Sequence, residues 1–232
     1  MPSTYLSLVN QVLEQLNEVP LTEISFSSAR GIHASAKNSV KYAIRKINAT
    51  KFEWPFNHGT KTQVLTAGQV EYTWPTDFKK PDWNSFQLQK NDTLATGAKQ
   101  LQFIKRDDYF HYFRDEDSNS VTGRTVPIYV FEAHGTSFGV TPSPNQAYTV
   151  VYKYWKHPTD LTLYSDTTTI PSEFDYVIVA GGLAHLKTFK NDFEGYQATK
   201  AEFQDGIKDM TQIFLSTDTY MSDTRVDNSY NW

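Results

Sequence analysis

The chain has 232 residues, of which 22 are basic and 26 acidic, so its formal net charge is −4. This length suits one large domain or two small ones, each able to bury a hydrophobic core. The absence of cysteine excludes disulfides, thiolate metal sites and cysteine nucleophiles. We expect neither a signal peptide nor a transmembrane helix, because the first residues carry no basic segment and no stretch reaches about 18 apolar residues.

Residues 4–17 have the apolar periodicity of a helix. Ser3 is the predicted N-cap, since a serine hydroxyl at this position can accept a hydrogen bond from the first turn. The pattern ends at residues 17–20. The apolar residues of this predicted helix share one face, at Leu6, Val9, Leu13 and Leu16.

A second helix is predicted to begin near Ser27 or Ser28. Pro55 cannot continue a helix, because proline lacks a backbone N–H, so the helical part ends before it. The apolar line of this second helix repeats at helical spacing through Ile32, Ala36, Val40, Ile44 and Ile47.

The next hundred residues change to the period of strands. A turn at residues 66–69 separates Val64 and Leu65 from an alternating segment, Val70–Trp74, which predicts a hairpin. The chain has 14 Tyr, 15 Phe and 5 Trp, and aromatic residues favour strands. One short helix is expected near residues 106–113. The further strand candidates are residues 85–90, 128–132, 137–141 and 147–156.

The helical period returns at Pro171, which suits the first turn of a helix. Gly181 and Gly182 fall in the middle of this predicted helix, where each glycine costs about 1 kcal/mol relative to alanine. Close packing against another helix explains why such a cost is tolerated. A last helix is predicted from about Phe193 to Phe214, followed by a polar tail without periodicity.

These patterns predict an α+β protein in which the two ends of the chain meet. Residues 1–56 and 171–215 are expected to form one helical bundle from an N-terminal and a C-terminal helix pair. Residues 57–170 are expected to form a β-sandwich-like insertion, and residues 216–232 a flexible, extended C-terminal arm.

The order of these segments resembles the head-to-tail adaptor (connector) proteins of tailed bacteriophages, and in particular the tail tubular protein A family. One helix pair closes with Glu53-Trp54-Pro55-Phe56-Asn57, and the second opens with Pro171-Ser172-Glu173-Phe174. The segment Leu8–Pro20 also resembles the start of that family. Two features depart from it: the strand insertion is longer than in the small, mainly helical adaptors, and the tail after Phe214 has no matching motif.

The resemblance implies a structural virion protein of the neck or tail region, assembled in the host cytoplasm, with no enzymatic activity, cofactor or membrane contact. Family members form a dodecamer, a twelve-subunit ring beneath the portal. Its partners would be the portal protein, a downstream tail or nozzle protein, and genomic DNA that passes through the channel during ejection without sequence-specific binding.

A basic stripe is predicted on the second helix. Lys37, Lys41 and Arg45 are spaced four residues apart, and Arg30 precedes them in a segment without acidic residues. The stripe can face DNA in the channel or an acidic surface of a neighbouring subunit. The alternative is the solvated face of an amphipathic helix.

The polar tail contains aromatic and basic residues of the kind that anchor a segment on a partner. By analogy with adaptors whose C-terminal arms dock on the portal, we interpret it as an interaction arm; the alternative is a frayed end. The candidate docking residues are Tyr220, Arg225, Tyr230 and Trp232.

The strand-rich insertion carries Trp74, Trp83 and Trp155, which are candidates for contacts with tail components or else belong to the core. The same aromatic content supports a rival function, a receptor- or carbohydrate-binding module of a tail spike or fibre. Long flanking helices and the absence of repeats oppose that rival.

Three other patterns fail as sites of chemistry. The acidic segment at residues 115–119 resembles a calcium loop, but Ser120 and Val126 occupy the positions that need Gly and Glu. The six histidines have no metal-ligand spacing. Asp107 and Asp108 lie near His111 but without a nucleophile motif, so a lytic enzyme is disfavoured.

Overall fold

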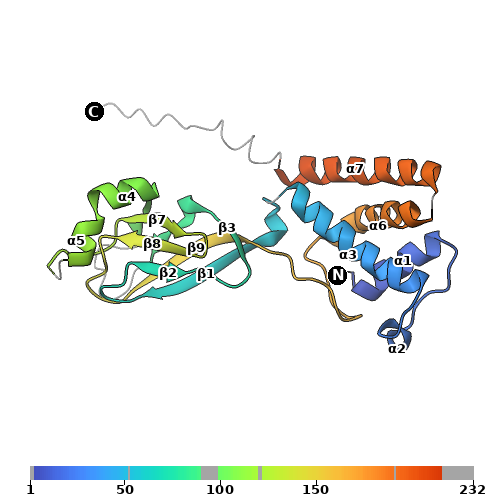
Figure 1. Ribbon diagram of the computed structural model, residues 1–232, viewed down its shortest axis with the longest axis horizontal. Coiled ribbons are helices and arrows are strands. Elements are labelled where there is room, and N and C mark those ends of the chain that lie inside the picture. Colours follow the sequence, from blue (N-terminus) through green and yellow to red (C-terminus); the bar gives the residue numbers. More distant parts are fainter. Residues whose placement is uncertain (1–2, 52, 90–98, 120–121, 191, 216–232) are drawn as a thin grey trace, which may run out of the picture. The chain divides into compact units, whose positions relative to one another are not determined.

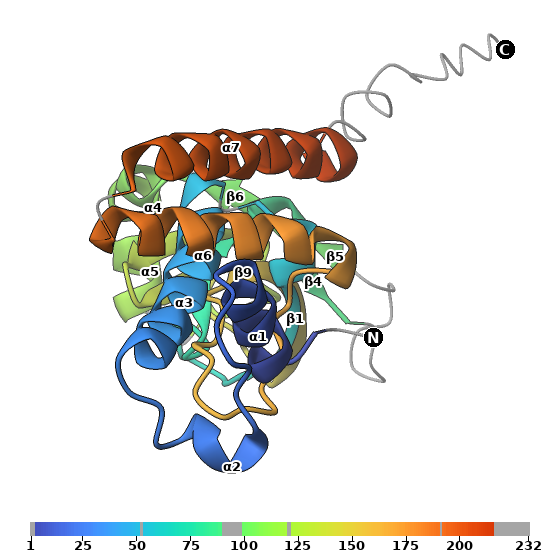
Figure 2. The same ribbon diagram turned by 90° about the vertical axis from the view of Figure 1, so that its right-hand side faces the viewer.

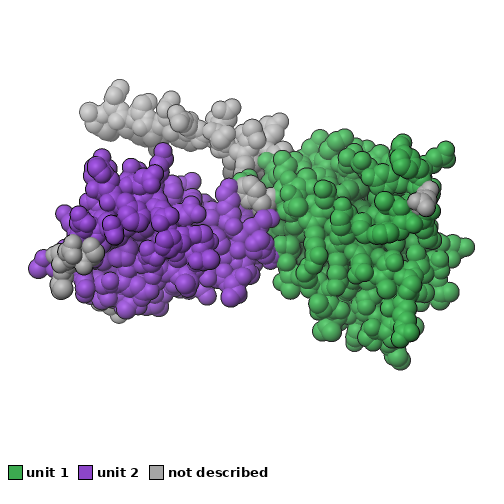
Figure 3. Space-filling view, viewed as in Figure 1, with its two compact units in different colours: residues 1–57, 158–232 green, residues 58–157 purple. Residues whose placement is uncertain are grey.

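The computed structural model describes residues 3–51, 53–89, 99–119, 122–190 and 192–215. The chain divides into two compact units, which Figure 3 distinguishes by colour. One unit combines residues 1–57 with residues 158–232, and the other comprises residues 58–157. Helices dominate the first unit and strands the second, so the predicted α+β class is confirmed.

The helical unit is built around α6 (Asp175–Phe189), which packs against α1 (Tyr5–Gln15), α3 (Ile32–Thr50) and α7 (Phe193–Leu215). Figures 1 and 2 show that α6 lies between α7 and the two N-terminal helices. The two ends of the chain therefore share one hydrophobic core. Its buried side chains include Leu8, Val12, Val40, Ile47, Val177 and Leu183.

The N-cap of α1 differs from the prediction. The hydroxyl of Thr4 accepts a hydrogen bond from the amide of Ser7, at 3.2 Å, and so caps the helix. The hydroxyl of Ser3 instead donates to the carboxylate of Asp175 at the start of α6. Ser3, one residue before the observed N-cap, therefore links the start of α1 to the start of α6.

The second predicted helix begins later than Ser27 or Ser28. A separate short helix, α2 (Glu23–Phe26), comes first, and the side chains of Thr22 and Ser25 cap it reciprocally. Gly31 then has a φ of 59°, in the left-handed region, and α3 starts at the next residue. The capping box starts a separate short helix, and α3 therefore begins only after Gly31.

The glycine pair of α6 confirms the predicted close packing. A Cβ added to Gly181 would lie 2.7 Å from the ring of Phe203 on α7 and 3.0 Å from Ala43 on α3. A Cβ on Gly182 would lie 3.3 Å from both Val12 and Ser39. The glycines therefore allow three helices to approach α6 at once. A 3-10 turn, Ser172–Phe174, precedes α6, so Pro171 lies just before this turn.

The strand unit contains two sheets that share one core. The first sheet has the order β1-β9-β4-β5, with β3 also paired to β9, and the second has the order β2-β8-β7-β6. The strands of the first sheet are β1 (His58–Leu65), β3 (Phe78–Pro81), β4 (Gln87–Leu88), β5 (Lys99–Gln100) and β9 (Tyr148–Lys156). Those of the second are β2 (Glu71–Thr73), β6 (Gln102–Ile104), β7 (Tyr129–His134) and β8 (Ser137–Thr141).

The predicted hairpin at residues 64–74 is wrong. β1 pairs with β9 and β2 pairs with β8, so the turn between β1 and β2 carries the chain from one sheet to the other. Gly68, with a φ of 76°, allows the change of direction. Alternating residues define strands, but the pattern does not identify the partner strand.

Two short helices connect a parallel strand pair that was not predicted. β6 and β7 are parallel, and α4 (Arg106–Tyr112) and α5 (Arg114–Asn119) lie between them in the chain. α4 matches the expected short helix, and α5 contains the acidic segment at residues 115–119. The crossover is needed because parallel strands cannot be joined by a tight turn.

The long strand β9 pairs with β1, β3 and β4 and contributes side chains to the core of the strand unit. Its residues Tyr148, Val150, Tyr152 and Tyr154, which alternate along the strand, are all buried. The ring of Tyr152 lies 5.4 Å from that of Phe138 on β8, between centroids, so side chains of the two sheets meet in the core.

The strand unit ends at His157 rather than at the predicted residue 170. The following segment belongs to the helical unit, where Leu161 and Ile170 are buried in the core. The amide of Tyr5 donates to the carbonyl of Asp166 at 2.7 Å. This segment forms neither helix nor strand over most of its length, so periodicity gave no signal for its assignment.

Candidate functional site

The motif at residues 53–57 forms a structural junction in the helical unit. Trp54 is completely buried, and its indole N–H donates to the carbonyl of Ile47 at 3.1 Å. Its ring stacks on Phe56, with centroids 5.5 Å apart, and meets the ring of Phe214 edge-on at 6.3 Å. The end of the N-terminal helix pair is thereby joined to the end of α7, so the motif stabilises the helical unit.

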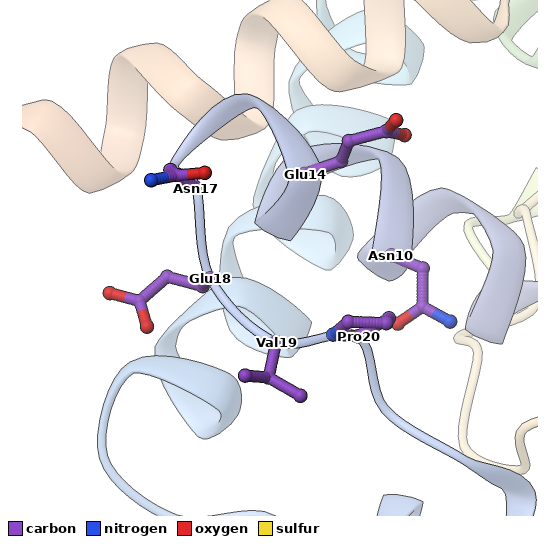
Figure 4. Close-up of a pocket in the computed structure, with 6 residues that line it drawn as sticks. All are labelled: Asn10, Glu14, Asn17, Glu18, Val19 and Pro20. Carbon is purple, nitrogen blue, oxygen red and sulfur yellow. The ribbon is translucent and has the colours of Figure 1, made fainter.

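The start motif at residues 8–20 likewise has a structural explanation. The side-chain amide of Asn10 donates to the carbonyl of Leu21 at 2.9 Å, and its oxygen accepts from the amide of Leu21 at 2.8 Å. Asn17 turns the chain with a φ of 56°. Figure 4 shows the hollow of about 560 Å³ between α1 and this turn, lined by Asn10, Glu14, Asn17, Glu18, Val19 and Pro20.

Lys37, Lys41 and Arg45 of the predicted basic stripe lie on α3, and Lys37 makes a contact within the chain. The ammonium group of Lys37 donates to the carbonyl of Phe26 at the end of α2, at 2.7 Å, and lies 4.1 Å from the centre of the Phe26 ring. Burial, with a smaller effect of neighbouring Lys41, lowers the pKa of Lys37. This lysine therefore anchors α2.

The last member of the stripe is also paired. The guanidinium of Arg45 forms two hydrogen bonds with Asp160, with Nε–Oδ1 and Nη2–Oδ2 distances of 2.9 and 2.6 Å. The hydrogen bond from Arg45 lowers the pKa of Asp160. Lys41 lies between, with its ammonium group 5.7 Å from the centre of the Tyr5 ring. Arg30 precedes α3 and so is not on the helix that carries the other three.

The three candidate tryptophans of the strand unit are partly buried. Trp74 stacks on Phe78, with ring centroids 4.1 Å apart, and both rings pack against the core together with Trp83. Trp155 lies beside His58 at 4.9 Å between ring centroids. Because each tryptophan is still partly exposed, contact with tail components stays a prediction for all three.

The candidate docking residues Tyr220, Arg225, Tyr230 and Trp232 lie outside the described residues. Within the described ranges, no group of three or more His, Asp or Glu side chains could hold a metal ion. No helix in that part of the chain is both long and apolar enough to cross a membrane.

A concave surface that sequence analysis missed lies between α3, α6 and α7. We call this hollow of about 820 Å³ the α3/α6/α7 groove. Gly181, Ala184, Phe203 and Ile207 give it apolar character, Tyr42, His185 and Tyr196 contribute rings, and three lysines line it: Lys46, Lys200 and Lys208. No acidic residue is among the described residues that line it. Only the glycine pair in α6 hinted at this surface, because it marked close helix contacts.

His185 is the one histidine among the described residues that line the groove. Its imidazole stacks on Tyr42 with centroids 4.2 Å apart, and meets the ring of Phe189 edge-on at 5.0 Å. Burial lowers its pKa below the ordinary value of 6.5, which favours the neutral imidazole. The groove is therefore aromatic, with its positive charge supplied by lysines.

A family model described as "SU10 adaptor protein" matches residues 3–227, which is nearly the whole chain and includes both units. No curated protein matches this sequence.

Proposed function

We propose that this chain, which belongs to the SU10 adaptor protein family of phage head-to-tail adaptors, forms a ring that joins the portal to the tail and lines part of the DNA channel. The family match carries the proposal, because it spans both units. Structural adaptors of this kind are generally non-enzymatic and lie in the virion neck. The proposed ring has twelve copies, closed by rotational symmetry.

The helical unit supplies the proposed ring contacts. Its core is complete within one copy, because α1, α3, α6 and α7 bury their apolar faces against each other. Copies would therefore meet through exposed side chains rather than by exchanging core helices. The strand unit is proposed to bind the downstream tail or nozzle protein, with Trp74, Trp83 and Trp155 as contact candidates.

The basic stripe is proposed to act mainly within the copy. Lys37 and Arg45 already have partners, and only their outward-facing atoms remain for DNA or a neighbour. Passage of DNA without sequence-specific binding requires weak contacts, and the pairing of Arg45 with Asp160 weakens its attraction for phosphates. The C-terminal arm, residues 216–232, is proposed to dock on the portal.

Negative-stain microscopy of the purified chain mixed with the portal ring of its own virus tests the proposal. The expected result is extra density with twelve-fold symmetry on the portal. Well-folded protein that adds no density would overturn the adaptor role and favour a receptor- or carbohydrate-binding module, which a glycan-binding assay would then detect.

A further inference from the structure

The short helix α2 presents an isoleucine, Ile24, to solvent. Ile24 on α2 is 90% exposed, whereas Phe26, two residues later, is 2% exposed. The side chains of Thr22 and Ser25 cap this short helix. A free loop could turn an isoleucine inward, but α2 fixes its orientation.

Two contacts hold α2 on the helical unit. The ring of Phe26 packs edge-on against Tyr5, with centroids 5.0 Å apart, and the ammonium group of Lys37 binds the carbonyl of Phe26. Val19, which is 73% exposed, lies in the preceding connection, and Glu23 is exposed beside Ile24. We call Glu23 and Ile24 the α2 knob: an exposed apolar side chain next to an acidic one.

The α3/α6/α7 groove has the complementary properties. It is concave, its apolar part includes Gly181, Ala184 and Phe203, and it carries lysines but no carboxylate among its described lining residues. Lys208 is partly neutralised by Asp205 at 2.7 Å, and Lys200 lies 5.4 Å from the centre of the Tyr196 ring. An apolar side chain next to a carboxylate is the partner that such a surface favours.

The knob and the groove lie on different parts of the same unit. Figures 1 and 2 show α2 and α7 at opposite edges of the helical unit. A knob therefore cannot enter the groove of its own copy while the unit keeps its fold. A contact between two different patches of identical subunits is heterologous, and repetition of such a contact produces a closed ring when the rotation fits.

We propose that the α2 knob of one copy inserts Ile24 into the α3/α6/α7 groove of the next copy, with Glu23 facing the groove lysines. This inference rests on the proposed ring and names the surfaces that close it. Lys37 acquires a role in it, because its bond to Phe26 holds the knob in position. The contact also gives a reason for the exposure of Ile24 in the single chain, because the next copy would bury it.

The test uses the full chain and measures self-association by sedimentation over a range of concentrations. Ile24→Asp is expected to raise the dissociation constant at least about tenfold, since an isoleucine buried at an interface contributes that much affinity. Leu163→Asp, at another exposed apolar position of the same unit, is the matched control and is expected to have no effect. Equal effects of the two variants would overturn the proposal.

Charge reversal gives a second, independent readout. Glu23→Lys and Lys200→Glu are each expected to weaken self-association, and the chain that carries both changes is expected to recover it. Failure of the double variant to recover any affinity would show that these two side chains do not meet.

The absence of cysteine permits a direct test of the head-to-tail geometry. Thr188 is exposed and lines the groove, so oxidation of the variant I24C/T188C is expected to produce a ladder of linked chains. Each single cysteine variant can form dimers at most. No ladder would overturn the interface, even if microscopy finds a ring on the portal. A ladder without portal density would retain the interface and remove the adaptor role.

Discussion

Arg45 and Asp160 form a two-point ion pair between α3 and the segment that returns from the strand unit. Both side chains are more than half exposed, at 63% and 55%. The pair fastens an irregular segment to the helical core while one edge of the guanidinium still faces solvent. Basic residues in a stripe on a helix can therefore stabilise the fold of their own chain as well as bind a partner.

Asp160→Lys is expected to lower the melting temperature slightly, because it places a cation beside Arg45 and Lys41. Exposed ion pairs contribute little, and salt screens them, so the effect should shrink as ionic strength rises. Thermal unfolding at low and high salt measures it. The chain with both Arg45→Asp and Asp160→Arg should recover most of the loss, and a melting temperature that stays low would show that the pair does not act through charge.

Trp54→Ala is expected to reduce the free energy of unfolding by about 3–5 kcal/mol, because it removes a completely buried ring from the junction of the two chain ends. Trp54→Phe keeps a ring and loses the hydrogen bond to Ile47, so its loss should be smaller. Urea unfolding followed by far-ultraviolet circular dichroism compares the two variants. A loss below about 1 kcal/mol for the alanine variant would contradict the structural role of the motif.

Gly181→Ala is expected to destabilise the protein by about 1–3 kcal/mol, because its Cβ would overlap the ring of Phe203 and press on Ala43. Gly182→Ala is the matched control. Its nearest contacts are 3.3 Å away, so the gain in helix propensity of about 1 kcal/mol should offset most of the strain. Equal free energies of unfolding for the two variants would refute the proposed closeness of α6 and α7.

His185 should make stability fall as the solution becomes acidic. Burial lowers its pKa in the folded state below the ordinary value of 6.5, so the unfolded chain binds a proton first. The contribution of neutral His185 is complete above pH 6.5 and decreases as the pH falls below it. Unfolding free energies at pH 7.5 and about pH 5.5 measure the slope.

His185→Gln is the control for that slope, since glutamine does not titrate. The pH dependence between these two values should become shallower in this variant. Asp160 and Asp166 do not account for the slope, because hydrogen bonds lower the pKa of each carboxyl below its ordinary value of 3.8. An unchanged slope would show that His185 is solvated.

The amino-acid sequence by itself determined the order of the segments and the apolar faces of the helices, because both depend on local periodicity. It also determined that glycines at positions 181 and 182 need close neighbours. The resemblance to phage head-to-tail adaptors rests on the same order, and the family match over residues 3–227 confirms it.

Only the tertiary structure decided which strands pair, where the strand unit ends and what the basic residues contact. β1 and β2 have hairpin-like sequences, yet β1 pairs with β9 and β2 with β8, and Leu65 and Tyr72 are buried in the shared core. The partner of Arg45 is 115 residues away in sequence. The α3/α6/α7 groove combines residues of three helices, and no local pattern records which side chains converge from separate helices, because packing between distant segments brings them together.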